Sequence, residues 1–162
     1  MPLPLDPDAP ADFDFIIGDW RVHHRRLKER LAGSTDWNSF EGLSATHKTL
    51  GGFGNVEDNQ LFMPGGSYRA IAVRSFDREA QSWSIWWLDG RSPGLLDTPV
   101  VGHFRDGVGL FYANDSHNGR PIKLRFTWHS PSDASPRWEQ AFSADGGVTW
   151  ETNWTMEFFR LS

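Results

Sequence analysis

The sequence has no cysteine among its 162 residues, which excludes a disulfide framework and a thiol nucleophile. It also lacks the basic start and the apolar run of a secretory signal, because its N-terminus, residues 1–10, is rich in proline and aspartate. No apolar run is long enough to span a membrane as a helix. We therefore expect a soluble protein of the cytoplasm.

Motifs of nucleophilic, phosphate-binding and zinc sites are also missing. There is no Gly-x-Ser-x-Gly elbow, and the glycine-rich run at residues 51–54 leads into another strand-like segment and not into a helix, which indicates a turn. The six histidines never show the His-x-His or His-x-x-x-His spacing of a zinc site. We expect no metal and no cofactor.

Positive charge is too scarce to suggest a nucleic-acid partner. The formal net charge is -5, and phosphate binding needs a basic surface. The one basic run, residues 23–30, would divide between the two faces of a strand, because successive side chains alternate. A solvated outer face is the simpler interpretation of this run, and an anion site is the alternative.

Aromatic residues, by contrast, are abundant and make up 14% of the chain, including nine Trp. Large rings can fill a barrel, line an apolar pocket or cover a dimer face, and composition does not choose among these. The length suits one domain that can enclose a core or a ligand cavity. We expect residues 1–11 to form an N-terminal arm and residues 12–162 to form the domain.

After Trp20 almost every segment is short, rich in aromatic or β-branched residues and bounded by turn residues, which is typical of β-strands. The expected strands are residues 20–31, 37–50, 55–62, 68–76, 83–88, 100–105, 109–114, 122–128, 137–142 and 150–160. This series predicts an all-β fold, a single closed up-and-down antiparallel barrel of about ten strands with a short N-terminal helical turn.

Two dipeptides typical of two-residue hairpin turns set the register of three of these strands. The Asn-Gly turn at residues 118–119 pairs Phe111 with Phe126, which places both rings inside the barrel. The Asp-Gly turn at residues 106–107 extends the same register to the preceding strand. There Phe104 points inward, while its neighbour His103 points outward and is therefore not a candidate ligand or base.

Residues 143–150, Ser-Ala-Asp-Gly-Gly-Val-Thr-Trp, match the Asp-box, a hairpin loop of several unrelated β-proteins. Asp145 is expected to hold the loop through hydrogen bonds to backbone amides, with Trp150 packed beneath it. The motif is a structural device and indicates no reaction. From it, the last hairpin is predicted to pair Phe142 with Trp150, Gln140 with Thr152, and Trp138 with Trp154. Arg160 then shares the inward face, and the outward residues are Glu139, Glu151, Asn153 and Glu157.

The start of the domain, Gly18-Asp19-Trp20, resembles the signature of lipocalins and of the wider calycin superfamily. In these proteins the tryptophan plugs the barrel floor, and a basic residue of the last strand lies across its ring. Arg160 stands where this partner is expected, and a guanidinium over an indole is a favourable cation–π geometry.

Nearly the whole chain after Asp12 also resembles a bacterial group of uncharacterised lipocalin-like proteins. The segments that carry the resemblance are residues 18–20 (Gly-Asp-Trp), 23–28 (His-His-Arg-Arg-Leu-Lys), 83–91 (Trp-Ser-Ile-Trp-Trp-Leu-Asp-Gly-Arg) and 138–147 (Trp-Glu-Gln-Ala-Phe-Ser-Ala-Asp-Gly-Gly). The resemblance implies a calycin-type barrel and no assigned reaction. The missing signal and disulfides depart from secreted lipocalins, so extracellular transport is not expected.

If Trp20 points into the barrel, then alternation directs His24 and Arg26 inward as well. Burial and the neighbouring guanidinium would keep the His24 ring neutral. His24 is the candidate proton-transfer residue, and because some lipocalin-like barrels bind haem through one histidine, it is also the candidate haem ligand. The alternative is a core histidine that is simply hydrogen-bonded.

We expect the barrel to bind a small, largely apolar or aromatic molecule. The expected ligand-binding residues are His24, Arg26, Trp86, Phe104, Phe126, Trp138, Gln140 and Trp154. The alternatives are a cofactor-independent enzyme (an isomerase, cyclase or hydrolase) that uses the same cavity, a haem-binding barrel, and a dimeric scaffold without a pocket.

The strand at residues 83–88 has apolar side chains on both faces, so its sequence does not show which face is inward. We expect one face to be covered, for which the second subunit of a homodimer is a candidate. The connection that follows, residues 89–99, is the longest without a strand pattern. It is either a functional rim or lid, or an ordinary surface loop.

Overall fold

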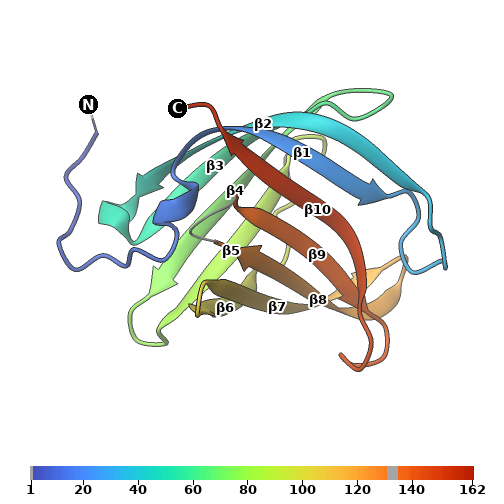
Figure 1. Cartoon of the computed structure of the whole chain (residues 1–162). Helices are drawn as coiled ribbons and strands as arrows, with labels where there is room; N and C mark the ends of the chain where they lie inside the picture. Colours follow the sequence, from blue (N-terminus) through green and yellow to red (C-terminus); the bar gives the residue numbers. More distant parts are fainter. Residues whose placement is uncertain (1, 131–134) are drawn as a thin grey trace.

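The computed structural model describes residues 2–130 and 135–162, which form a ten-stranded antiparallel β-barrel (Figure 1). Its strands are β1 (Gly18–Leu27), β2 (Trp37–Thr49), β3 (Gly54–Leu61), β4 (Tyr68–Asp77), β5 (Ser82–Asp89), β6 (Val100–Arg105), β7 (Val108–His117), β8 (Arg120–His129), β9 (Arg137–Ser143) and β10 (Glu151–Arg160). Each strand pairs with the next, and β1 also pairs with β10. The predicted closed up-and-down barrel is therefore confirmed. Within the described ranges, no helix is long and apolar enough to cross a membrane.

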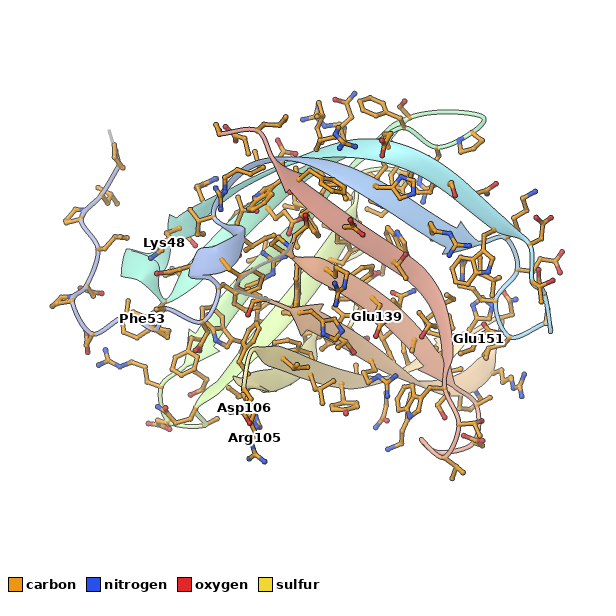
Figure 2. All side chains as sticks on the ribbon, in the orientation of Figure 1. Lys48, Phe53, Arg105, Asp106, Glu139 and Glu151 are labelled. Carbon is orange, nitrogen blue, oxygen red and sulfur yellow. The ribbon has the colours of Figure 1, made fainter. Side chains whose placement is uncertain are left out.

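One end of the barrel, here called the plugged end, is filled by the short 3-10 helix η1 (Asp14–Ile16) and the residue before it. The ring of Phe13 packs edge-on against Trp83 and Phe104, with centroids 4.9 Å from each. Lys48 reaches this end from β2 (Figure 2), and its side chain pairs with Asp14 at 2.8 Å. A second 3-10 turn, η2 (Leu50–Gly52), follows β2. The predicted helical turn thus closes the floor.

Trp20 and Arg160 bind the two ends of the chain together at this floor. The Arg160 guanidinium lies 4.1 Å from the centroid of the Trp20 ring, which confirms the predicted cation–π pair. Trp20 Nε1 donates to the carbonyl of Ile16, and Arg160 Nη1 donates to that of Ile17. Gly18 has φ +124°, and a Cβ there would lie 2.6 Å from Arg160 Nη1, so glycine alone fits this position.

The register of β6, β7 and β8 is the one predicted from the two hairpin turns. Phe111 pairs with Phe126, and Phe104 pairs with Gly109, while His103 is exposed. Asp106 and Asn118 have the positive φ values, 53° and 51°, that these turns require. Figure 2 shows Asp106 at the tip of the β6–β7 hairpin, at the plugged end.

The predicted register of the last hairpin is wrong. Glu151 pairs with Phe142 and Thr152 pairs with Ala141, because Trp150 belongs to the loop and not to β10. A β-bulge at Asn153 then shifts the pairing by one residue. The observed pairs beyond the bulge are Trp154 with Gln140 and Met156 with Trp138. Asn153, expected outside, is fully buried and accepts a hydrogen bond from Gln140.

The inward face of β5 carries Trp83, Ile85 and Trp87, because Trp83 and Ile85 are buried and alternation directs Trp87 the same way. The pairing of β5 with β6 is short and runs only from Trp83 to Ile85. Beyond it, residues 90–99 cover the end of β5 through a bridge between Leu88 and Leu96. The loop therefore continues the sheet beside the end of β5, where β6 does not pair with it.

Candidate functional site

The opposite end of the barrel, here called the open end, contains a cavity of about 200 Å³. Glu151, at the start of β10, marks this end in Figure 2. The cavity walls are aromatic in depth and charged at the mouth. The aromatic wall residues are Trp87, Phe126, Trp138, Phe142 and Trp154, and the charged mouth residues are Arg26, Arg30, Asp89, Asp97 and Asp115.

The tryptophan rings of the wall stand nearly at right angles to one another. Trp154 meets Trp87 at 90° with centroids 5.7 Å apart, and it meets Trp138 at 89° and 5.2 Å. Phe126 adds a third edge-to-face contact to Trp138 at 5.0 Å. Such contacts favour fixed ring positions, so the wall presents flat apolar faces with little freedom to rearrange.

Two guanidinium groups lie on one side of the mouth. Arg26 stacks 4.5 Å from the Trp154 ring and donates to the Tyr68 hydroxyl at 3.1 Å, while its Nε atom is buried and has no hydrogen-bond partner among the described residues. Burial, and then the charge of Arg26, lowers the pKa of Arg30. In the described part of the chain, neither arginine has a carboxylate within 4.0 Å. This side can therefore neutralise an anion.

Carboxylates lie on the other side of the mouth. Asp89 is held by Arg91 at 2.7 Å, and this hydrogen bond lowers the pKa of Asp89. Partial burial, and then the charges of Asp115 and Asp89, raises the pKa of Asp97. The mouth is thus polarised: Arg26 lies near the end of β1 and Arg30 just beyond it, whereas Asp115 of β7 and Asp97 of the loop after β5 have no ion-pair partner among the described residues.

His24, the candidate proton-transfer residue, does not reach the cavity wall. Its ring is 1% exposed, stacks on Phe40 at 4.6 Å, and accepts a hydrogen bond from Trp154 Nε1 at 3.1 Å. Burial, and then the charges of His23 and Arg26, lowers its pKa to about 3. The ring is neutral, as predicted, but it orients Trp154 instead of contacting a ligand.

Nε2 of His24 also faces the backbone and not the cavity. A Cβ at Gly42 would lie 2.9 Å from this nitrogen, so β2 approaches the ring as closely as only glycine allows. With Nδ1 engaged by Trp154 and Nε2 against β2, His24 offers no open position to an iron atom. The haem alternative therefore has no ligand at His24.

The other predicted site residues divide into two groups. Five of them line the cavity together: Arg26, Phe126, Trp138, Gln140 and Trp154. Trp86 does not, because it lies on the outer face of β5 and its neighbour Trp87 takes the inward position. Phe104 points inward as expected, but at the plugged end, where it packs on Phe13.

Sequence reasoning missed Trp87, Arg30 and the acidic side of the mouth. The alternation of Trp83, Ile85 and Trp87 was the available signal for Trp87, but the opposite face of the strand is apolar too. Arg30 lies beyond the end of β1, in a segment without regular periodicity. Asp97 belongs to the loop before β6, and nothing in a loop sequence shows which side chains turn inward.

The Asp-box loop is built as predicted, away from the cavity wall. Asp145 accepts hydrogen bonds from the amides of Val148 and Thr149 and from the Thr149 hydroxyl, and Trp150 Nε1 donates to Gly147. The Trp150 ring lies under the guanidinium of Arg125 at 4.4 Å. These contacts hold the β9–β10 connection at the rim of the open end.

No protein-family model matches the sequence, and no curated protein is significantly similar to it.

Proposed function

We propose that the protein binds a small aromatic molecule in the open end of the barrel. The single observation that supports this most is the cavity itself, in which three tryptophan rings at right angles surround about 200 Å³ of space. This volume is smaller than the roughly 300–1,000 Å³ that is common for small-molecule sites. We therefore expect a small ligand, with one aromatic ring or two fused rings. An anionic group on the ligand would lie against Arg26 and Arg30, which have no carboxylate within 4.0 Å among the described residues.

We also propose that the protein belongs to a bacterial group of lipocalin-like proteins within the calycin superfamily. The closed antiparallel sheet, the Gly18-Asp19-Trp20 opening and the Arg160 stack support it. The barrel has ten strands, whereas lipocalins have eight, so the likeness is to the wider superfamily. Action in the cytoplasm and a homodimeric state belong to the same proposal, and native mass spectrometry of the purified protein would count the subunits and identify a co-purifying ligand.

Adjacent tryptophans on β5 provide a matched test of the ligand site. We expect Trp87→Leu to weaken binding of 2-naphthoate about tenfold, because the variant removes one aromatic face of the cavity. Trp86→Leu changes the same residue type on the outer face and should leave the affinity unchanged. Quenching of tryptophan fluorescence on titration measures both. No binding to the wild-type protein, or equal losses in the two variants, would contradict the proposal.

An enzymatic function receives no comparable support from the geometry. The candidate base, His24, has its Nδ1 atom occupied by Trp154 and does not line the cavity. A general base must reach the proton that it removes, directly or through one water. The cavity is therefore better suited to holding a molecule than to transferring a proton through this histidine.

A further inference from the structure

A second and much smaller space, here called the inner chamber, lies beyond the cavity towards the plugged end. It measures about 20 Å³ and shares four wall residues with the cavity, namely Ile85, Trp87, Phe126 and Trp138. The two spaces are therefore adjacent, and this belt of apolar side chains lines both of them. Beyond the belt, the inner chamber has a polar floor that the cavity lacks.

The floor consists of a buried ion pair between Glu57 of β3 and Arg74 of β4, with side chains 3% and 2% exposed. Arg74 also donates to the Asn55 side chain at 2.7 Å, and the Ser44 hydroxyl donates to Glu57 at 3.1 Å. Buried charges are tolerated when they are paired and hydrogen-bonded in this way. The network fixes the positions of both charged groups at the floor.

Two N–H donors of residues that line the inner chamber have no hydrogen-bond partner among the described residues. They are Nε1 of Trp128 and Nε of Arg74, and both atoms are shielded from solvent. A buried donor without a partner costs about 1–3 kcal/mol, so native proteins usually supply an acceptor. The volume of about 20 Å³ accommodates one small group, since about 10–15 Å³ suffices for a water-sized probe.

We propose that the inner chamber receives a single oxygen at the tip of the ligand, a hydroxyl or carbonyl that accepts hydrogen bonds from these donors. This inference rests on the proposed function. The expected ligand is then an aromatic carboxylate that carries a hydroxyl or carbonyl oxygen at the end opposite the carboxylate. The carboxylate lies at Arg26 and Arg30, the rings lie among the tryptophans, and the far oxygen lies at Trp128 and Arg74. A hydroxyl there can also donate to Glu57.

Three probes with the same 2-naphthoate ring system test this inference on the wild-type protein. They are 2-naphthoate, 6-methyl-2-naphthoate and 6-hydroxy-2-naphthoate, which differ only at the end that would enter the chamber. We expect the hydroxyl compound to bind about 3- to 10-fold more tightly than the methyl compound, which has the same shape and no oxygen. Isothermal titration calorimetry measures the three affinities. This comparison needs no variant and does not depend on how a variant folds.

Trp128→Phe then removes the Nε1 donor and keeps an aromatic ring. The expected result is a ratio of hydroxyl to methyl affinity that falls towards one, whereas Trp86→Phe on the outer face leaves the ratio unchanged. Equal affinities of the two probes for the wild-type protein would overturn the inner-chamber inference and leave the proposed function standing. If none of the probes binds, the proposed function fails, and the inference fails with it.

Discussion

Burial of the His24 ring makes the free energy of unfolding depend on pH. Its pKa is lowered from 6.5 to about 3 in the fold, so between these pH values the unfolded chain binds more protons than the folded chain. The stability that the neutral ring contributes is complete above pH 6.5 and is lost as the pH falls, by roughly 1.4 kcal/mol per pH unit. The loss arises because only the unfolded chain takes up the proton in this range, since burial keeps the ring neutral in the folded protein down to about pH 3.

Comparison with His24→Gln isolates this contribution. The glutamine can still accept the hydrogen bond of Trp154 Nε1, but it does not titrate. We expect the free energy of unfolding of the wild-type protein to fall more steeply below pH 6.5 than that of the variant, as measured by urea unfolding at a series of pH values. Parallel profiles would mean that His24 takes up its proton as readily in the fold as in the unfolded chain.

At the scale of single elements, the Asp-box loop depends on one exposed carboxylate. Hydrogen bonds from Thr149, and then from Ser143, lower the pKa of Asp145 to about 2. The Asp145 carboxylate therefore stabilises the loop fully at pH values above its ordinary pKa of 3.8, and this stabilisation is lost as the pH falls through about 2. We expect Asp145→Ala to loosen it at neutral pH as well.

Amide hydrogen exchange measures this effect on the loop. The amides of Val148 and Thr149, which donate to Asp145, should exchange faster in the variant. The turn at residues 106–107 lies at the other end of the barrel and serves as the internal control. Unchanged protection of Val148 and Thr149 would show that the remaining loop contacts suffice.

The elements that sequence reasoning predicted well are those with a local signal. Positive-φ turns set the register of β6 to β8, because each turn type allows one pairing. The β9–β10 hairpin differs, because its loop extends through Trp150 and the extra residue at Asn153 changes the pairing inside a strand. A bulge of this kind depends on burial across two strands, which no dipeptide encodes. For β5, two apolar faces left the choice between Trp86 and Trp87 open.

At the scale of the whole molecule, the Trp20–Arg160 pair joins the first strand to the last. We expect Arg160→Gln to destabilise the fold by about 1–2 kcal/mol, through loss of the cation–π contact and of the hydrogen bond to Ile17. Arg21→Gln is the matched control, because Arg21 also stacks on a ring, that of Phe159, but on the exposed outer face. Urea unfolding measures the free energy of unfolding of both variants. Equal losses in the two variants would contradict a special role for Arg160.

The candidate site could be predicted only in part, because a cavity is a property of the closed barrel. Alternation along a strand predicted inward orientation correctly for Arg26, Trp138 and Trp154. It could not show the depth of each residue along the barrel axis, which is why Phe104 was expected at the ligand and instead fills the plugged end. Depth follows from strand tilt and stagger around all ten strands, and these emerge only when the sheet closes.

The short seam between β5 and β6 has a kinetic consequence. Three residue pairs join these strands, whereas ten join β1 to β2. Local opening of a sheet begins where the fewest backbone hydrogen bonds must break, so the barrel wall should part first at this seam. The loop at residues 90–99 lies there and carries Asp97 of the mouth. Exchange of the proposed ligand is therefore expected to depend on local opening at this seam, which includes Trp87 of β5, whereas Trp138 and Trp154 lie on β9 and β10, away from it.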